Sequence, residues 1–506
     1  MTRRRLARPL STVLVIIMIL TLTPRAEASG VSVDGSAIAK IDAYVAEMVK
    51  QSGIPGAALA LVKGDQTVFS KGYGVSNLAL NSPVAADTAY GIGSITKSFT
   101  ALAILQLRDQ GLVDLDAPVQ CYLPWFRVAD EQASRQITIR HLLNHTSGLP
   151  GNSHGLVWND PAVIRPSIEQ AVRALKDVKL RHPVGSSFEY ANMGYATLGL
   201  VIEKLSSQRY EDYLQRQILD HLGMRRSTAD NDRAAALADT AKPYWWPFGR
   251  LSQSPLRMGE YMAPAGDMFL SSANDMARYV RFQLGYQNLI SASTLAEWHN
   301  GGVAVDPQSG SYQMGLFNST LHGHKLVQHG GDATGSSAIM MLLPDDDIGV
   351  VLLMGASAPQ TPFSIGTGVL SIILGEEPPA AVPPNPWITI GRLSLLMALA
   401  AFLLLLGLPV CWFARRRRNA KAFSLPKGFV IGSALVLCLA TVFGWFWVMT
   451  TAFSLGIPVP WGVYGWPLDI ALGFGGLLIA LTLWSLYLAG LAMVILRQPL
   501  SPTLPR

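Results

Sequence analysis

The fold is decided by one stretch, Gly91-Ile-Gly-Ser94-Ile-Thr-Lys97-Ser-Phe-Thr-Ala101. A helix brings residues three apart onto one face, so the Ser94 hydroxyl and the Lys97 amine can meet. The glycines allow a tight entry into the helix, whose N-terminus favours developing negative charge. The apolar residues 101–107 that follow predict a buried core helix, with Gly111 as its cap. The stretch therefore predicts a nucleophilic serine with a lysine one turn later.

Composition and charge limit the classes of protein to which this chain can belong. The chain has 506 residues, enough for two to four domains, and half of them are hydrophobic. The net charge of +6 would suit a nucleic-acid partner, but residues 1–28 carry +4 and residues 387–506 carry +8. The remainder, 29–386, is acidic at −6. The basic residues therefore indicate export and membrane topology, and we expect no nucleic-acid partner.

Cysteines and histidines predict neither a disulfide nor a metal site in the central region. Cys411 and Cys438 lie in apolar runs, which leaves only Cys121 between them and the N-terminus. One cysteine cannot form an internal disulfide, so this region must depend on core packing. The nine histidines show no spacing typical of metal ligands. We expect no metal and no cofactor.

The N-terminus has the three parts of a secretory signal peptide. Arg3-Arg4-Arg5 and Arg8 form a basic region, and Leu10–Thr23 is a short apolar run. Ala26-Glu27-Ala28 supplies a small-x-small cleavage pattern. We predict a signal peptide over 1–28, and an uncleaved anchor is the alternative.

Residues 29–375 have the composition of one globular domain with an α+β order. A helix, a hairpin, a largely helical middle and a group of terminal strands follow one another. The terminal strands are expected to join one antiparallel sheet, with the helices packed on it or forming a second lobe. The acidic turn Asp345–Asp347 is expected to be solvated. The predicted elements are a helix over 36–51, strands over 56–62 and 67–69, helices within 137–206, and strands over 325–328, 337–343 and 348–354.

The C-terminal part predicts a linker followed by membrane helices. Residues 376–392 form a proline-rich linker that should be stiff and extended. Three apolar runs, 393–414, 429–453 and 468–496, are each long enough to span a bilayer. We therefore expect three transmembrane helices in contact with membrane lipid.

Charge around these runs predicts their orientation. Arg415–Arg418, Lys421 and Lys427 fall in the loop between the first two runs, which should be cytoplasmic. The loop 454–467 has no Lys or Arg and should lie outside. This topology places 29–386 on the periplasmic or extracellular side of the cell membrane, in agreement with the signal peptide.

Two further motifs could complete a site with Ser94. A serine hydroxyl needs a base, which Lys97 could supply, and a second acid–base group for the leaving group. Tyr190-Ala-Asn192 offers a phenol and an amide that could orient a substrate. His329-Gly330-Gly331 offers an imidazole for proton transfer or for gripping an anion, and glycines beside which a substrate backbone can lie.

Each motif also occurs elsewhere in the chain, so the flanking sequence must separate them. The alternatives are Ser424-Leu-Pro-Lys427, Tyr286-Gln-Asn288 and His299-Asn-Gly301. Tyr190 lies in a turn that feeds a helix, and His329 opens a strand pair. Ser424 falls in the predicted cytoplasmic loop, away from the other motifs. The flanks therefore favour the combination of Ser94, Tyr190 and His329.

The three motifs, in this order, resemble the serine β-lactamase and penicillin-binding protein superfamily, and most closely its class C-like branch. The segments His141–Pro150 and Pro264–Ala277 look like this family too, and the resemblance covers roughly 35–375. It implies an α/β sandwich with a helical lobe and a site between the two. The His145 segment is expected to shape a loop.

The resemblance also implies roles for the site residues. Ser94 would be the acylated nucleophile, with Lys97 and Tyr190 as the acid–base pair. Asn192 would contact substrate, and His329 would be the third-motif residue, with Gly330, Gly331 and Asp332 beside it at the substrate. The N–H groups of Ser94 and Asp332 would form an oxyanion hole. Where this chain has His329-Gly330-Gly331, many β-lactamases and DD-peptidases carry Lys-Thr-Gly, so efficient β-lactam turnover is not expected.

These features predict an exported, membrane-anchored serine hydrolase that acts on amide or ester bonds through an acyl-enzyme. The substrate would be a small molecule or a peptide, such as a D-amino-acid peptide cleaved by a DD-carboxypeptidase, a D-aminopeptidase or a prodrug-activating peptidase. An esterase or a β-lactamase is the alternative within the superfamily. A non-catalytic protein that binds penicillin or wall fragments is the alternative of another class, and it would need a cytoplasmic output domain. Oligomeric state is left open.

Overall fold

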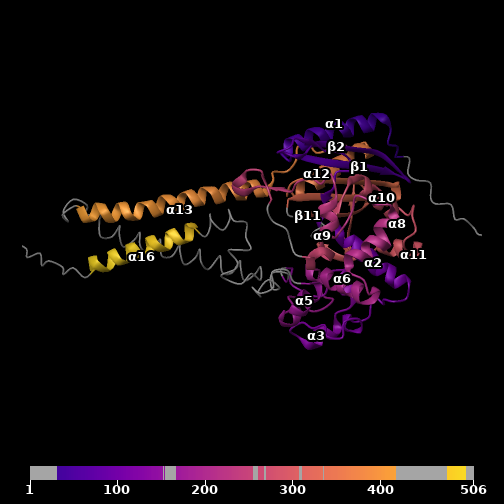
Figure 1. The fold of residues 1–506 in the computed structure, drawn as a ribbon, viewed down its shortest axis with the longest axis horizontal. Helices are drawn as coiled ribbons and strands as arrows, with labels where there is room; N and C mark the ends of the chain where they lie inside the picture. Colours follow the sequence, from indigo (N-terminus) through magenta and orange to yellow (C-terminus); the bar gives the residue numbers. More distant parts are fainter. Residues whose placement is uncertain are drawn as a thin grey trace, which may run out of the picture.

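The computed structural model describes residues 31–151, 153, 167–254, 260–266, 269–306, 310–333, 335–417 and 476–496 (Figure 1). The predicted signal peptide, the second predicted membrane run and the first part of the third lie outside these residues. Those predictions therefore remain predictions.

A nine-stranded antiparallel sheet forms the centre of the globular domain, in the order β3-β2-β1-β13-β12-β11-β10-β9-β8. The middle strands are almost entirely apolar and buried, because helices cover both faces of the sheet. The antiparallel α+β fold is confirmed. The strands are β1 (Gly56–Lys63), β2 (Gln66–Asn77), β3 (Ser82–Pro83), β8 (Val303–Asp306), β9 (Gly310–Gln313), β10 (Leu316–Leu321), β11 (His324–Ala333), β12 (Ser336–Leu343) and β13 (Ile348–Met354).

Helices from the two ends of the domain cover one face of the sheet. α1 (Gly35–Ser52) and α12 (Gln360–Leu374) pack together there, over alternate residues of β1, β12 and β13 (Figure 1). α10 (Ala273–Gln283) packs on β1 and β13 from the other face of the sheet. Buried residues of α10 and of α2 (Thr96–Asp109) belong to a second core cluster on that face. The sheet therefore separates two apolar cores.

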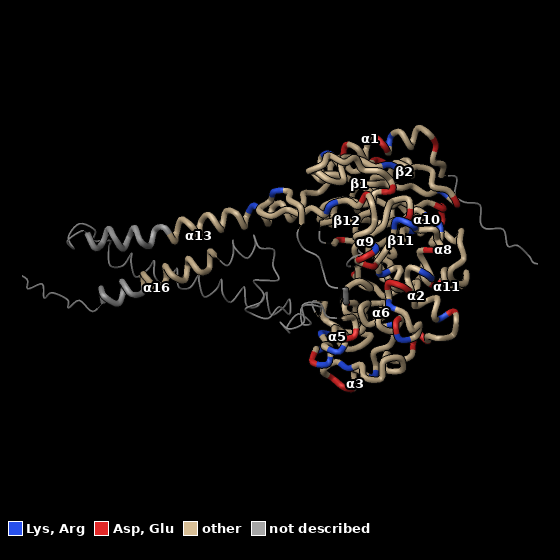
Figure 2. The backbone as a smooth tube through the Cα atoms, viewed as in Figure 1, with Lys and Arg blue, Asp and Glu red and all other residues tan. Residues whose placement is uncertain are grey.

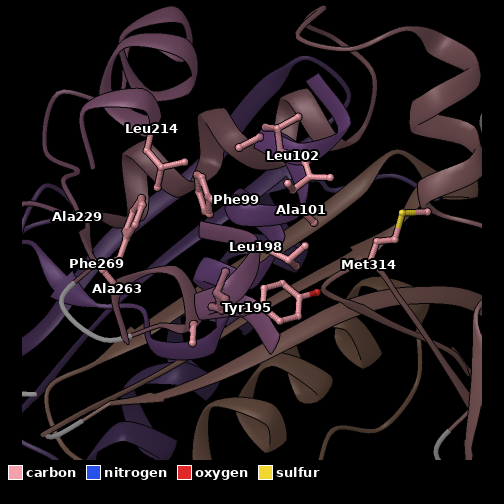
Figure 3. Close-up of a cluster of buried hydrophobic side chains, with 14 of the residues drawn as sticks. Phe99, Ala101, Leu102, Tyr195, Leu198, Leu214, Ala229, Ala263, Phe269 and Met314 are labelled. Carbon is pink, nitrogen blue, oxygen red and sulfur yellow. The ribbon is translucent and has the colours of Figure 1, made fainter. Parts of the chain in front are cut away.

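The rest of the second core lies in a lobe of helices next to the α10 side of the sheet. The apolar residues of α2 meet α6 (Asn192–Ser206), and Phe99, Leu102, Tyr195 and Leu198 lie in one cluster (Figure 3). α2 is therefore the buried core helix that its sequence predicts. The other helices on this side are α3 (Glu131–Gln136), α4 (Ile139–Leu143), α5 (Ile168–Arg173), α7 (Tyr210–Leu214), α8 (Asp220–Leu222), α9 (Asn231–Ala236) and α11 (Ala292–Trp298).

Two local predictions need correction. β11 continues to Ala333 instead of ending at residue 328, because residues 327–333 pair with β12. The acidic turn is solvated only at Asp345, since Asp346 is 1% and Asp347 8% exposed. The Asp346 carboxylate lies 2.7 Å from Nδ1 of His324, and its carbonyl accepts a 2.6 Å hydrogen bond from Lys63 Nζ. Partners from distant strands therefore bury this acidic side chain.

The C-terminal part departs from the predicted linker. α13 (Pro386–Arg417) begins inside it, and residues 386–405 have the length and composition of a membrane span. Figure 2 shows α13 leaving the domain with a long uncharged stretch, whereas acidic and basic residues are interspersed over the domain. α16 (Gly476–Leu496) packs along α13, and Trp484 Nε1 donates a 2.7 Å hydrogen bond to the Leu404 carbonyl.

Candidate active site

Ser94 lies in a single turn of 3₁₀-helix, η1 (Gly93–Ile95), that leads directly into α2. Gly93 before it has φ +52°, a left-handed conformation that suits glycine. A Cβ on Gly93 would lie 2.7 Å from the Asp332 backbone nitrogen, and one on Gly331 would lie 1.8 Å from the Ile92 carbonyl oxygen. Main chain from β11 therefore passes directly against the turn that carries Ser94.

Lys97 is fully buried and points at Ser94. Its Nζ donates a 3.0 Å hydrogen bond to Ser94 Oγ, as the spacing of three residues predicts. The amine also donates to the carbonyl oxygen of Ala265, at the end of η7 (Glu260–Ala265). It lies 4.6 Å from the ring centroid of Tyr190. The lysine is thus held between the serine, a backbone carbonyl and an aromatic face.

Tyr190 reaches Ser94 from the loop before α6. Burial raises the pKa of its phenol, and a hydrogen bond with Ser94 acts in the opposite direction. The phenol is therefore neutral at rest and lies within proton-transfer reach of the serine. Asn192 begins α6, and its buried Oδ1 has no hydrogen-bond partner among the described residues. This oxygen could accept a hydrogen bond from a substrate N–H.

His145 lies against Tyr190, closer to the predicted site than a loop-shaping role implies. Their ring centroids are 4.3 Å apart. The Ala191 N–H donates to His145 Nδ1 at 3.1 Å, and the Glu189 N–H donates to the His145 carbonyl at 2.8 Å. Burial and the charge of Lys97 keep the pKa of His145 well below its ordinary value. The neutral imidazole thus holds the main chain after Tyr190, and the backbone carbonyl of His145 holds the main chain before it.

Removing this imidazole should loosen Tyr190. His145→Ala is expected to slow the reaction of Ser94 with a fluorophosphonate probe by roughly tenfold or more, part of the ~10²–10⁴-fold effect of a positioned acid–base group. His141→Ala is the matched control, because His141 caps α4 with Thr138. An equal labelling rate in wild type and His145→Ala, with both folded by circular dichroism, would limit His145 to a structural role.

His329 lies on β11 with its imidazole buried in the site. Its Nε2 lies 3.4 Å from the hydroxyl of Tyr312, on β9. Burial, together with the positive charge of Lys97, lowers the pKa of His329 to about 3. The imidazole is therefore neutral near pH 7, so it can take part in proton transfer but supplies no positive charge for an anion.

This burial makes stability depend on pH. The unfolded chain takes up a proton on His329 below about pH 6.5, whereas the folded chain resists it down to about pH 3. The stability is complete above the higher pKa and decreases as pH falls through this window, by up to about 1.4 kcal/mol per pH unit. We expect His329→Gln to flatten the decrease in melting temperature between pH 6.5 and 4.

His299 provides the control for this measurement. Burial also lowers its pKa to about 3, and its Nε2 lies 2.7 Å from Oε1 of Gln283. His299→Gln should flatten the pH dependence of melting in the same way and leave Ser94 labelling unchanged. Wild-type melting that is constant between pH 6.5 and 4 would contradict both assignments.

The end of β11 offers an open edge beside Ser94. β10 pairs with β11 only from His324 to Gln328, and among the described strands none pairs with that edge of residues 329–333. Gly331 faces η1, whereas a Cβ on Gly330 would face Ile339 at 3.7 Å. The backbone N–H of Asp332, the predicted oxyanion donor, therefore lies at this edge against Gly93.

The structure brings the predicted residues together and separates the alternative motifs. Tyr286 lies by the β1–β2 turn, where a Cβ on Gly64 would approach its hydroxyl at 3.5 Å. His299 is satisfied by Gln283, and Ser424 lies outside the described residues. Sequence reasoning missed Tyr312 and the Ala265 carbonyl. Ala265 lies in a segment singled out by the resemblance, whereas no motif marks Tyr312.

The chain is similar to several known proteins. The family model described as Beta-lactamase matches residues 41–367. Protein flp of Staphylococcus aureus (strain MW2) is 28% identical over 329 residues, which make up 64% of each chain. The chain thus spans just under two thirds of the length of this curated relative. Beta-lactamase-like protein 2 of Dictyostelium discoideum is 33% identical over 51% of this chain and 48% of that protein.

Solved structures show the same fold. The octameric penicillin-binding protein homologue from Pyrococcus abyssi superposes with a TM-score of 0.61 and 30% identity, covering 71% of this chain and 81% of that one. The D-stereospecific amidohydrolase from a Streptomyces species has a TM-score of 0.55 and 25% identity, covering 66% and 98%.

Proposed function

Because the chain belongs to the Beta-lactamase family of serine hydrolases, we propose that it cleaves amide bonds of D-amino-acid compounds through an acyl-enzyme on Ser94. The observation that carries this proposal is the 3.0 Å hydrogen bond from buried Lys97 to Ser94, with the Tyr190 phenol on the same serine. This arrangement supports an activated nucleophile with a second acid–base group.

The reaction proceeds in two halves. Ser94 Oγ attacks the carbonyl carbon while its proton passes to Lys97 in its neutral amine form, and the N–H groups of Ser94 and Asp332 stabilise the oxyanion. Collapse of this intermediate breaks the bond to the leaving group, which takes a proton from the Tyr190 phenol, and Tyr190 regains a proton from Lys97. A water molecule then attacks the acyl-enzyme, gives up a proton to the same pair and releases the acid, and Ser94 regains its proton.

Neutral His329 favours an amide of a D-amino acid over a substrate with a terminal carboxylate. Penicillins and D-Ala-D-Ala peptides carry such a carboxylate, which a cationic lysine in the third motif would attract. Here the corresponding imidazole has a pKa near 3 and is uncharged at pH 7. The structural likeness to the Streptomyces D-stereospecific amidohydrolase supports this choice.

A substrate comparison tests this proposal. In detergent-solubilised full-length protein we expect kcat/KM for D-amino-acid p-nitroanilides to exceed that for their L-isomers, and for acyl-D-Ala-D-Ala, by at least about tenfold. A discrimination of this size corresponds to about 1.4 kcal/mol in the transition state. Equal rates for both isomers, or preferential turnover of short acyl esters, would instead indicate an esterase. Labelling by fluorescent penicillin without any turnover would indicate the non-catalytic binding protein.

We also propose that the enzyme is exported and anchored in the cell membrane by three helices, with the hydrolase domain outside. The signal-peptide pattern of residues 1–28 and the basic loop after residue 414 support this topology. α13 supports the anchor, because residues 386–405 are long and apolar enough to cross a bilayer.

A further inference from the structure

The start of α13 packs directly against the globular domain and is not joined to it by an extended linker alone. It packs against η6 (Pro247–Gly249) through main-chain contacts. A Cβ on Gly391 would lie 2.2 Å from the Gly249 backbone nitrogen, and one on Gly249 would lie 2.8 Å from the Ile388 carbonyl oxygen. No larger side chain fits between the two segments. We call this contact, together with Trp246, Ser357 and Asn385, the helix seat.

Ser357 joins the helix seat to the domain through its carbonyl oxygen. This oxygen accepts hydrogen bonds from Trp246 Nε1 at 3.0 Å and from Asn385 Nδ2 at 3.1 Å. The Oδ1 of Asn385 in turn accepts the N–H of Trp387, in the first turn of α13, at 3.1 Å. Both Ser357 and Asn385 are buried. The start of the helix is therefore tied to Ser357 by one asparagine.

The other groups of Ser357 hold the turn between β11 and β12. Its hydroxyl donates to the Ala333 carbonyl at 3.1 Å and accepts the N–H of Gly335 at 3.0 Å. Its N–H donates to the Tyr244 carbonyl at 3.1 Å, and the Tyr244 N–H donates to the Gly335 carbonyl at 3.1 Å. The turn begins at Ala333, the residue that follows Asp332.

A second connection reaches Asp332 itself. The N–H of Ala358, next to Ser357, donates to Ser337 Oγ at 2.7 Å, and Ser337 Oγ donates to Asp332 Oδ1 at 2.7 Å. Asp332 and Ser337 are directly opposite each other in the β11–β12 ladder. Residues 357 and 358 thus contact the open end of β11 through both the turn and the Asp332 side chain.

We propose that Ser357 and Asn385 are positioning residues, through which the seated start of α13 holds the end of β11 against η1 and aligns the Asp332 N–H with Ser94. This inference rests on the proposed function, because the alignment matters for catalysis only if Asp332 stabilises an oxyanion. That charge develops in the transition state, so a looser β11 edge lowers kcat more than it raises KM. Removing an oxyanion donor outright costs about 10²–10³-fold in kcat. Making the position of one oxyanion donor less rigid should lower kcat by about tenfold.

The test compares four variants of the full-length protein in detergent with the best D-amino-acid amide. Asn385→Ala and Ser357→Ala each remove a link, and Ser357→Thr retains the hydroxyl. Ser394→Ala is the matched control on α13, because its hydroxyl bonds only to Ile390 of the same helix among the contacts that the structure describes. We expect the two alanine variants at the seat to lose about tenfold in kcat with KM within twofold. Ser357→Thr should recover to within threefold of wild type, and Ser394→Ala should match wild type.

Hydrogen–deuterium exchange on the same proteins provides a readout that does not need activity. Exchange at residues 332–337 should accelerate in Asn385→Ala and Ser357→Ala but not in Ser394→Ala. Unchanged exchange there would overturn the proposal, and so would faster exchange with an unchanged kcat. Wild-type protein that neither turns over the amide nor labels with fluorophosphonate would contradict the proposed function and the catalytic part of this inference. The exchange would then decide the structural part separately.

Discussion

Ser94→Ala is expected to abolish fluorophosphonate labelling and to lower amide hydrolysis by at least about 10³-fold, because it removes the hydroxyl that Lys97 Nζ contacts at 3.0 Å. The expected loss is large because nucleophile, base and acid act as one unit. The measurement is gel fluorescence of the labelled protein together with the initial rate of amide cleavage, both on the full-length chain.

Ser98→Ala is the control on the same helix. Ser98 is buried one turn later, its hydroxyl donates to the Ile95 carbonyl at 2.8 Å, and it accepts from the Tyr279 hydroxyl at 2.9 Å. Its loss should cost about 1 kcal/mol of stability and leave labelling intact. Labelling that survives in Ser94→Ala would show that the probe modifies another residue and would contradict the assignment of the nucleophile.

Gly331→Ala should have the second large effect. The added Cβ would lie 1.8 Å from the carbonyl oxygen of Ile92, which is backbone and cannot rotate away. β11 must therefore move from η1, and the Asp332 N–H moves with it. We expect labelling of Ser94 to slow by about 10²-fold or more, in the range for loss of one oxyanion donor.

Gly330→Ala separates this effect from a general loss of stability. It adds the same methyl group one residue earlier, where the nearest atom is Cδ1 of Ile339 at an ordinary 3.7 Å. This variant should label within about threefold of wild type and melt at a similar temperature. Similar labelling rates in the two alanine variants would show that β11 does not need its close approach to η1.

The sequence predicts the part of the site that local rules determine. A spacing of three residues on a helix is enough to place Lys97 against Ser94, and the structure has this contact at 3.0 Å. Strand alternation is enough to direct His329 and Gly331 toward one face of β11. The flanking sequence also separates Tyr190 and His329 from the motifs at Tyr286 and His299.

Contacts between distant elements could not be predicted in the same way. Tyr312 is marked by no motif, and it reaches His329 only because β9, β10 and β11 are neighbours in the sheet. His145 lies far in the sequence from Tyr190 and His329. Its ring nevertheless accepts the N–H of Ala191, which is 46 residues away and directly follows Tyr190. In the sequence Asp346 looks like an exposed turn residue. In the structure its carboxylate contacts His324, and its carbonyl oxygen accepts a hydrogen bond from Lys63. Such burial depends on the whole fold.

The boundary of α13 was mispredicted for a related reason. The prolines of residues 376–392 favour an extended linker, but Pro386 is acceptable in the first turn of a helix, where its missing N–H has no partner to lose. The close packing of Gly391 on Gly249 then fixes where the helix begins relative to the domain. Proline content alone does not reveal that contact.

Acid-quenched mass spectrometry can locate the acyl group that we propose Ser94 carries. Full-length protein is mixed with a D-amino-acid ester or amide, quenched within the first turnover and digested. We expect a mass increase equal to the acyl group on the peptide that contains Ser94, and no such increase in Ser94→Ala. Turnover without an adduct on that peptide, or with the adduct on another residue, would contradict this assignment.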